Sequence, residues 1–345
     1  MHHDPLISSR KKPLVSWGHD WVVLCILIVD PFWAPTKVFA LPVAARLYRN
    51  RQGLTKGKRG QAKAKEPEAD PDHRTRPELA VELIKLAASW FPDDTVIVTG
   101  DSAYGGKSVL GQLPGNVHLI SHVHPKGALY ELPPQPAPNS KSKGRPRKKG
   151  ARLPGMAAWA EDPERPWTEL AFGQFGLHAT LAVKTIQALY YKSGGDRLLT
   201  IVLVRDKKGG RPDQMFYCTE LDWDARQVLS TYACRWAIEC TFENCKQLMG
   251  LGEQADRVPR AVERTASMAF FLYSLVVVWF HQMGHRFVRF PSRPWYRRKQ
   301  EPSFADMLTT LRRVSFEEKP EPLLSDRSGL KTWIAQLTEL LSRAG

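Results

Sequence analysis

The sequence predicts an α/β fold, and three observations support this prediction. Runs of β-branched and aromatic residues over 13–29 and 95–99 are typical of strands. Between them, apolar residues recur at helical spacing over 77–90, and Pro77 stands at the start, where a helix tolerates a missing N–H. From 167 to 219 the chain alternates like β-structure, and helical patterns follow it. Its 345 residues suffice for one large or two ordinary domains.

Composition and charge narrow the class of partner. Lys and Arg outnumber Asp and Glu by 50 to 35, which gives a net charge of +15 and a pI of about 9.7. Such a field favours a polyanion, with nucleic acid ahead of an anionic membrane surface. The five cysteines form no Cys-x2-Cys pair. This argues against a disulfide framework or a structural zinc site and predicts a reducing, cytoplasmic location.

The first elements are predicted to be a hairpin and a basic loop. The strand over 13–29 ends at Asp30 and Pro31, and 37–45 is its expected partner. Residues 46–65 are basic and rich in Gly and Gln. We interpret them as a solvated loop rather than as a specific DNA contact.

Asp101 is the first candidate catalytic residue. The strand over 95–99 runs into Gly100 and Asp101, and a turn of small residues follows. A carboxylate at the C-terminal end of a buried parallel strand lies where α/β sheets place reactive groups. An aspartate at this position can equally cap the next helix. Taken alone, the residue favours the cap.

Three histidines accompany the next predicted strand, 117–123. His118 and His122 would share one face of it, and His124 would lie beside the following turn. Histidine clusters can bind metals, but no carboxylate completes a ligand set here. We therefore interpret the three as a polar strand edge rather than as a metal site.

A basic linker and a strand-rich region come before the C-terminal helices. Residues 132–154 combine Pro with Lys and Arg and cannot bury a core. Their positive charges are expected to contact DNA phosphates. The strands expected after the linker are 175–183, 188–191, 198–205 and 214–219.

The segment from Tyr232 to Lys246 contains no Pro or Gly and is predicted to be one helix. At about 100° per residue, Tyr232, Arg235, Glu239 and Lys246 fall within about 60° of each other. Such a stripe suits a phosphate chain with a metal ion. A solvated face with an Arg235–Glu239 ion pair is the alternative, and geometry alone favours it. The apolar residues expected to hold this helix on a core are Trp236, Ile238, Phe242 and Leu248.

The spacing Tyr-x2-Arg-x3-Glu-x6-Lys resembles the motif that ends the catalytic domain of many bacterial insertion-sequence transposases of the DDE superfamily. The resemblance implies an RNase H-like catalytic core that holds two Mg²⁺ or Mn²⁺ ions and cleaves and transfers DNA at transposon ends. It makes Asp101 and Glu239 metal ligands. Glu243 lies on the same stripe, so geometry leaves it as a second candidate ligand. The DNA contacts that the resemblance implies are Tyr232, Arg235 and Lys246.

The resemblance also implies a domain order, with a β-rich insertion inside the RNase H-like core. The expected segments are the first part of the core (1–130), a basic Pro-rich linker (131–155), the insertion (156–220), the core with its site helix and apolar helix (221–285) and a basic helical C-terminal region (286–345). In the last region, helices are expected over 303–313 and 330–342.

The resemblance begins late in the family's pattern. The family's first catalytic aspartate lies on a central strand, whereas 14–29 resembles the second strand. This first strand is therefore expected to be missing, which would leave its two neighbours without a hydrogen-bond partner. Asp4, Asp20 and Asp30 are the only upstream acids able to substitute for the first ligand. We expect a truncated and inactive copy of a transposase.

Three other interpretations stay open. The chain could be a non-catalytic DNA-binding remnant that inhibits full-length transposase, or a nuclease of the same fold that does not transpose. A membrane protein built on the apolar run 265–285 is the third. We interpret that run as a core helix, because it also holds Ser, His and Gln side chains. The expected partners are transposon-end and target DNA and a second or full-length transposase copy, with no membrane.

Overall fold

The computed structural model describes residues 2–3, 15–16, 18–49, 73–134, 147–253, 258–290, 299–317, 335 and 339. Most of the predicted loop 46–65, nearly all of the predicted helix 330–342 and Asp4 lie outside these residues. The chain divides into two compact units. Unit 1 comprises Met1–Leu24 and Ala44–Arg235, and unit 2 comprises Cys25–Val43 and Trp236–Gly345.

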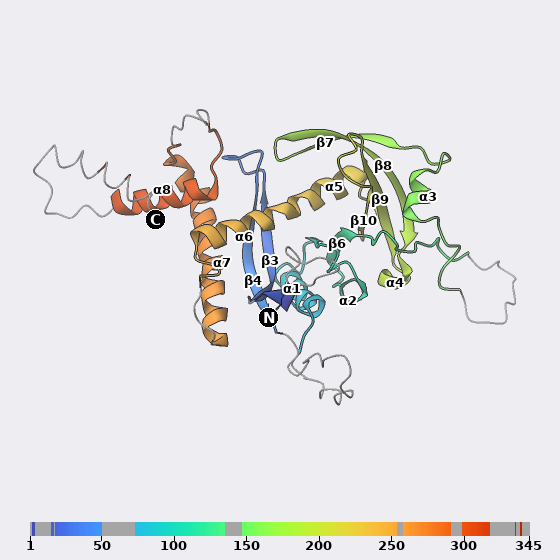
Figure 1. Cartoon of the computed structure of the whole chain (residues 1–345), viewed down its shortest axis with the longest axis horizontal. Helices are drawn as coiled ribbons and strands as arrows, with labels where there is room; N and C mark the ends of the chain where they lie inside the picture. Colours follow the sequence, from blue (N-terminus) through green and yellow to red (C-terminus); the bar gives the residue numbers. More distant parts are fainter. Residues whose placement is uncertain are drawn as a thin grey trace, which may run out of the picture. The chain divides into compact units, whose positions relative to one another are not determined.

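Unit 1 is built on one mixed six-stranded sheet, in the order β5-β6-β10-β9-β8-β7 (Figure 1). β5 and β6 run parallel, and every other neighbouring pair runs antiparallel. The strands predicted as an insertion therefore continue the sheet that begins with β5 and β6. Their bounds are Val96–Thr99 (β5), Val117–His122 (β6), Thr168–Gln174 (β7), Leu177–Leu189 (β8), Leu198–Asp206 (β9) and Gln214–Cys218 (β10).

Alternation along these strands gives the sheet two apolar faces. Leu119, Ile201 and Tyr217 are fully buried on one face, and Ile120 and Val202 are fully buried on the other. Four of the described helices cover the first face, and a fifth covers the second. The helices on the first face are α1 (Arg76–Trp90), α2 (Lys107–Leu110), α3 (Met156–Ala160) and α4 (Tyr191–Gly194), and the helix on the second is α5 (Ala225–Ala233).

Local sequence explains where α1 begins. Thr75 is its N-cap, and its hydroxyl accepts a hydrogen bond from the backbone N–H of Glu78, while the Glu78 carboxylate accepts one from the backbone N–H of Thr75. This reciprocal capping box satisfies two donors that the helix itself cannot. The amphipathic helix predicted over 77–90 is confirmed.

The predicted N-terminal hairpin is a separate two-stranded sheet of β3 (Asp20–Val29) and β4 (Val38–Tyr48). The strand predicted over 13–29 is shorter than expected, because β3 begins only at Asp20, after Gly18 and His19, which are not in a strand. Before Gly18, β2 (Val15–Ser16) pairs with β1 (His2–His3). Within the described residues, β3 pairs only with β4, and β5 pairs only with β6.

The prediction of separate strands over 175–183 and 188–191 is wrong. β8 is continuous, and a tight turn at Phe175 and Gly176 joins it to β7. Both turn residues have positive φ, 54° and 70°. A two-residue hairpin turn requires this conformation, but phenylalanine adopts it rarely, so the sequence pattern suggested a strand instead.

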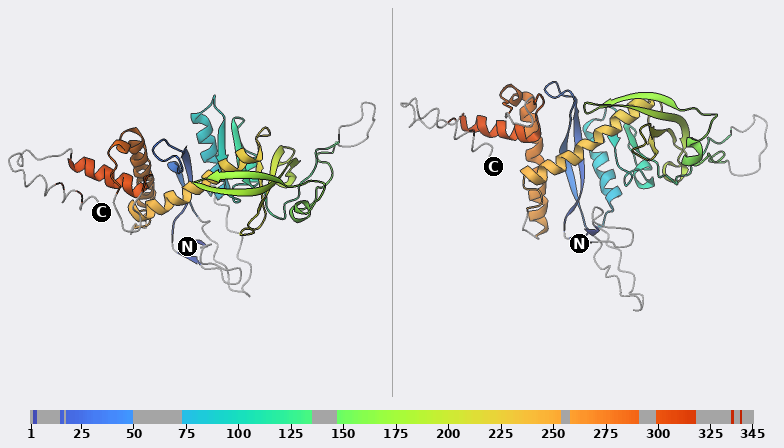
Figure 2. Two further views of the ribbon diagram at one scale, coloured as in Figure 1. Left: turned by 90° about the horizontal axis from the view of Figure 1, so that it is seen from above. Right: turned by 45° about the horizontal axis from the view of Figure 1, so that its top comes forward.

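Unit 2 consists of the far end of the β3–β4 hairpin and three helices, α6 (Ala237–Leu248), α7 (Pro259–Gln282) and α8 (Phe304–Glu317), with a short 3-10 turn at Gly284–Arg286. The rings of Phe242 and Phe270 lie 6.0 Å apart between α6 and α7, and those of Tyr273 and Phe304 stack at 4.3 Å between α7 and α8. Figure 2 shows α8, coloured red, beside α7, coloured orange. α8 confirms the helix predicted over 303–313.

Most of the apolar run predicted as a core helix, 265–285, lies within α7, which ends at Gln282. Arg260–Gln282 is the one helix, among the described residues, that is long and apolar enough to cross a membrane, and 39% of its apolar window is buried. One side of α7 therefore belongs to a core, and the other does not.

Candidate active site

Asp101 lies immediately beyond the end of the parallel β5–β6 pair. The last bond of this ladder runs from the Gly100 N–H to the Ile120 carbonyl at 3.0 Å. The Asp101 side chain is exposed, and its Oδ1 accepts a hydrogen bond from the Ala103 N–H at 2.8 Å. The helix that follows, α2, has Gly106 rather than Asp101 as its N-cap. The alternative interpretation of Asp101 as a helix cap is therefore wrong.

The turn after Asp101 is braced from beneath by Ser121 of β6. The Ser121 hydroxyl donates to the Asp101 carbonyl at 2.8 Å, and the Tyr217 hydroxyl donates to the Gly105 carbonyl at 3.1 Å. A Cβ at Gly105 would lie 2.6 Å from the Ser121 Oγ. The glycine is needed because the turn approaches β6 this closely, and this packing fixes the backbone that presents the Asp101 carboxylate.

Aromatic and basic groups of unit 1 surround this carboxylate. Thr99 of β5 pairs with Ile120 of β6 in the parallel register. Asp101 and His122 each lie two residues further along, so they stand opposite each other at the end of the two strands. The His122 ring lies 4.3 Å from that of Phe216 and 5.0 Å from that of Tyr232. Tyr232 lies at the end of α5, and the guanidinium carbon of Arg235 is 5.7 Å from the Tyr232 ring. The structure thus brings together two of the predicted DNA-contacting residues and Asp101.

Burial and neighbouring charges shift the pKa values of three side chains in this group. Burial lowers the pKa of His122, and the Arg235 charge lowers it further, while Asp101 opposes the change. Burial raises the pKa of Tyr232 against the influence of Arg235. Burial, followed by the charges of Asp101 and Asp20, raises the pKa of Tyr104 to about 12. At neutral pH the site therefore presents a neutral imidazole and two phenol hydroxyls with a guanidinium, all of which can donate to phosphate oxygens.

Among the three upstream acids, Asp20 is the one described in unit 1. It stands at the start of β3, and its Oδ2 accepts from the Arg76 Nε at 2.7 Å. The charge of Asp20, like that of Asp101, raises the pKa of Tyr104. Asp30 lies in unit 2 at the end of β3, with φ of 46°.

The predicted single helix from Tyr232 to Lys246 is wrong in one respect. α5 ends at Ala233, a 3-10 turn covers Cys234–Trp236, and α6 starts at Ala237. A 3-10 turn advances about 120° per residue instead of about 100°, so the buried face of the helix shifts. As a result Trp236 is 60% exposed and is not a core residue. The buried residues of α6 are Ala237, Thr241 and Cys245.

The boundary between the two units falls inside the motif, between Arg235 and Trp236. Glu239, Glu243 and Lys246 therefore belong to unit 2, where all three are exposed on α6. Glu243 accepts a hydrogen bond from the Gln247 amide at 3.2 Å. Glu239 lies in the first turn of α6, where a negative charge is favourable.

The other two predicted strand-edge histidines have ordinary partners. His118 Nε2 lies 3.2 Å from a Glu220 carboxylate oxygen, and His124 Nδ1 accepts from the Lys126 N–H at 3.1 Å. In the described part of the chain, no group of three or more His, Cys, Asp or Glu side chains forms a metal site. Sequence reasoning missed the place of His122 beside Asp101. The parallel register of β5 and β6 would have revealed it.

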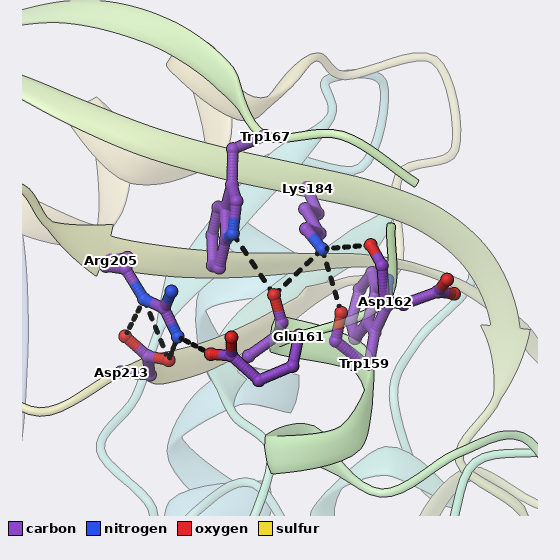
Figure 3. Close-up of polar contacts among 8 residues, drawn as sticks. Trp159, Glu161, Asp162, Trp167, Lys184, Arg205 and Asp213 are labelled. Carbon is purple, nitrogen blue, oxygen red and sulfur yellow. Dashed lines mark hydrogen bonds and ion pairs between the residues drawn. The ribbon is translucent and has the colours of Figure 1, made fainter. Parts of the chain in front are cut away.

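A second cluster of charges in unit 1 has a structural role (Figure 3). The buried Lys184 ammonium donates to three backbone carbonyls, those of Trp159, Ala160 and Asp162, at 2.9, 2.9 and 3.0 Å. Arg205 is bonded to the carboxylates of Asp213 and Glu161. Both cations hold the segment after α3 onto the sheet, and every proton of the ammonium is used.

Comparison with known families agrees with this geometry. The family model described as DDE superfamily endonuclease matches residues 22–194, which is half of the chain. The match includes β3 to β8 and Asp101 and ends before the Tyr232–Lys246 motif. No curated protein matches the chain.

Proposed function

The chain belongs to the DDE superfamily of endonucleases, and from this premise we propose that it derives from an insertion-sequence transposase that cleaves DNA and transfers the cut strand. The observation that carries the proposal is the position of Asp101. Its exposed carboxylate stands at the end of a parallel strand, beside Tyr232, Arg235 and His122. A carboxylate beside donors of this kind suits a phosphodiester with a divalent ion.

The residues proposed to hold Mg²⁺ or Mn²⁺ are Asp101 and Glu239. Both carry oxygen donors and both are exposed, which fits a hard cation that keeps several water ligands. When bound, such an ion polarises a phosphoryl oxygen and lowers the pKa of a bound water. The chain's own contribution is to bind and orient DNA. Arg235 supplies a planar fork of donors for phosphate oxygens, and the Tyr232 ring lies beside it.

The charge of the chain supports DNA as the substrate. A net charge of +15 favours association with a polyanion without sequence preference. The proposed partners are the ends of the mobile element, its target DNA and a second or full-length transposase copy. A cytoplasmic location is part of the same proposal.

A cleavage assay tests the proposal. Supercoiled plasmid carrying the element's ends is incubated with Mg²⁺ or Mn²⁺, and nicked and linear products are measured. An active chain would cut the plasmid only in the presence of metal, and Asp101→Asn and Glu239→Gln would each abolish the cutting. The inactive copy that the sequence predicts would bind the plasmid without cutting it. The matched controls are Asp93→Asn, at an exposed aspartate in the turn before β5, and Glu243→Gln, one turn further along α6.

The outcomes separate the candidate functions. Cutting that survives Glu239→Gln but not Glu243→Gln would move the ligand role to Glu243. Salt-sensitive binding of DNA without cutting, weakened by Arg235→Ala, would favour the non-catalytic DNA-binding remnant. Cutting without joining of the cut end to target DNA would favour a nuclease that does not transpose. Absence of both binding and cutting would contradict the proposal.

A further inference from the structure

Three aromatic rings of unit 1 pack together at Tyr232, one of the proposed DNA-contacting residues. His122 of β6 and Phe216 of β10 are cross-strand partners, and the centres of their rings lie 4.3 Å apart. The Tyr232 ring, near the end of α5, contacts both. Its centre is 5.0 Å from that of the His122 ring and 4.8 Å from that of the Phe216 ring. Phe216 is 6% exposed, so the cluster is anchored in the core.

The three rings meet in arrangements that hold them in place. The Tyr232 ring is nearly perpendicular to that of His122, with an interplanar angle of 86°, and is inclined by 59° to that of Phe216. Edge-to-face pairs of this kind are attractive beyond the apolar area that they bury. The ladder between β6 and β10 fixes two of the rings relative to each other. These two rings therefore give the third a defined position.

Tyr232 in turn lies beside Arg235. α5 ends one residue after Tyr232, and the 3-10 turn that follows carries Arg235. The guanidinium carbon of Arg235 lies 5.7 Å from the centre of the Tyr232 ring. The charge of Arg235 and its side-chain hydrogen bond with Tyr232 both lower the pKa of the tyrosine, although burial raises this pKa by more. The position of the ring therefore affects the position of the guanidinium.

We propose that His122 and Phe216 are positioning residues for DNA binding. Their rings fix Tyr232, and Tyr232 fixes the Arg235 guanidinium at the point where it meets a phosphate. The inference rests on the proposed function, since Arg235 needs a fixed position only if DNA binds there. It gives the histidine opposite Asp101 a role through packing rather than through contact with the substrate.

Direct contact is the competing role for His122. A neutral imidazole has an N–H group that can donate to a phosphate oxygen. The two roles differ in what they require of the side chain. Packing requires a planar ring between Phe216 and Tyr232, whereas direct contact requires a nitrogen that carries a proton.

Substitutions of this one residue separate the two roles. His122→Phe keeps a planar ring and removes both nitrogens. His122→Asn and His122→Gln remove the ring and keep an N–H donor, near the places of Nδ1 and Nε2 respectively. We expect the phenylalanine variant to bind DNA within about twofold of the wild type, and each amide variant to bind at least about threefold more weakly.

The salt dependence of binding is the decisive measurement. Fluorescence anisotropy of a labelled duplex carrying one end of the element gives the affinity of the full chain between about 50 and 200 mM salt. The slope of log affinity against log salt reports the number of phosphates neutralised. The amide variants should lower this slope by about 1, as Arg235→Ala does. A smaller folded fraction alone would weaken binding equally at every salt concentration and leave the slope unchanged.

A double variant tests whether His122 acts through Arg235. In an Arg235→Ala background, His122→Asn should cause no further loss of affinity, because the group that the ring positions is gone. His118→Asn is the matched control. His118 lies four residues earlier on the same face of β6, and its substitution should leave the affinity and the slope unchanged. Phe216→Leu, which keeps an apolar side chain without a ring, should lower the slope as the amide variants do.

The outcomes distinguish failure of this inference from failure of the proposed function. A wild-type chain that binds no DNA contradicts the proposed function, and the positioning role falls with it. If the wild type binds, a lower slope in His122→Phe would overturn the positioning role. An unchanged slope in both amide variants would overturn it as well, and so would a further loss from His122→Asn in the Arg235→Ala background.

Discussion

Replacing Lys184 with methionine should destabilise unit 1 more than any other single change of a charged residue on its sheet. Lys184 is 5% exposed, and its three ammonium protons go to the carbonyls of Trp159, Ala160 and Asp162. The ammonium also lies 4.9 Å from the centre of the Trp167 ring. Methionine keeps a stem of similar length and removes only the charge and its donors.

The partners that remain set the size of the effect. The Ala160 carbonyl still accepts from the Trp167 Nε1 at 3.1 Å, and the Trp159 carbonyl still accepts from the Asp162 N–H at 3.3 Å. The Asp162 carbonyl loses its donor from Lys184, which costs about 1–3 kcal/mol. Two further charge-assisted bonds disappear, but the desolvation penalty of the ammonium disappears with them. We expect a net loss of about 2–4 kcal/mol.

Urea unfolding followed by tryptophan fluorescence measures this loss, and native-state hydrogen exchange of β8 and β9 localises it to unit 1. Lys192→Met is the matched control, because Lys192 is exposed on α4 and should change the free energy of unfolding by no more than about 0.5 kcal/mol. A Lys184→Met chain as stable as this control would refute the reasoning, since the buried ammonium would then contribute nothing that an apolar side chain cannot.

Three further perturbations test unit 2 and the site. Burial raises the pKa of Asp306, but its hydrogen bonds to Lys299 and Ser303 together outweigh burial and hold the folded pKa below the usual value of 3.8. The contribution of Asp306 to stability is therefore present above that value and is lost as the pH falls through the folded pKa. Asp306→Asn should therefore flatten the fall in urea midpoint at acidic pH. If the chain cleaves DNA, Asp20→Asn should lower the cleavage rate at least about 100-fold, as expected for a lost third carboxylate. Arg235→Ala should weaken DNA binding and reduce the salt slope by about 1.

Controls separate these effects from general damage to the fold. Asp93→Asn should leave the acidic dependence of stability unchanged. Arg76→Gln breaks the same ion pair as Asp20→Asn without removing a carboxylate, so an equal loss of cleavage would assign Asp20 a structural role. Lys208→Ala, in the exposed turn between β9 and β10, should keep most of the DNA affinity if Arg235 lies at the binding surface and Lys208 does not.

Elements set by local chemistry were predictable from the sequence. The capping box at Thr75 and Glu78 marks the start of α1, and the apolar run that ends at Gly100 marks the end of β5. These features depend on neighbours within a few residues, so a single sequence is sufficient to recognise them. The placement of Asp101 at a strand end follows from the same local pattern.

Features set by distant contacts were not predictable. Phe175 adopts a positive φ because the turn between β7 and β8 requires it, against its own preference. The 3-10 turn at Cys234–Trp236 exposes Trp236, and no residue within it signals the change of helix type. His122 is near Asp101 only because β5 and β6 pair in one particular register.

The two clusters of charge in unit 1 show how structural and functional charges can be told apart. All three ammonium protons of Lys184 are committed to carbonyl oxygens of the same unit, and the Nε and Nη2 of Arg205 are committed to the carboxylates of Asp213 and Glu161. A ligand could reach these donors only by breaking existing bonds. Asp101 is exposed, and in the described part of the chain its carboxylate receives one hydrogen bond, from a backbone N–H. Burial also keeps the neighbouring His122 neutral, so it adds no charge that would compete for this carboxylate. A site that must accept a cation and a phosphate needs such uncommitted capacity, and in unit 1 the sheet edge at Asp101 provides it.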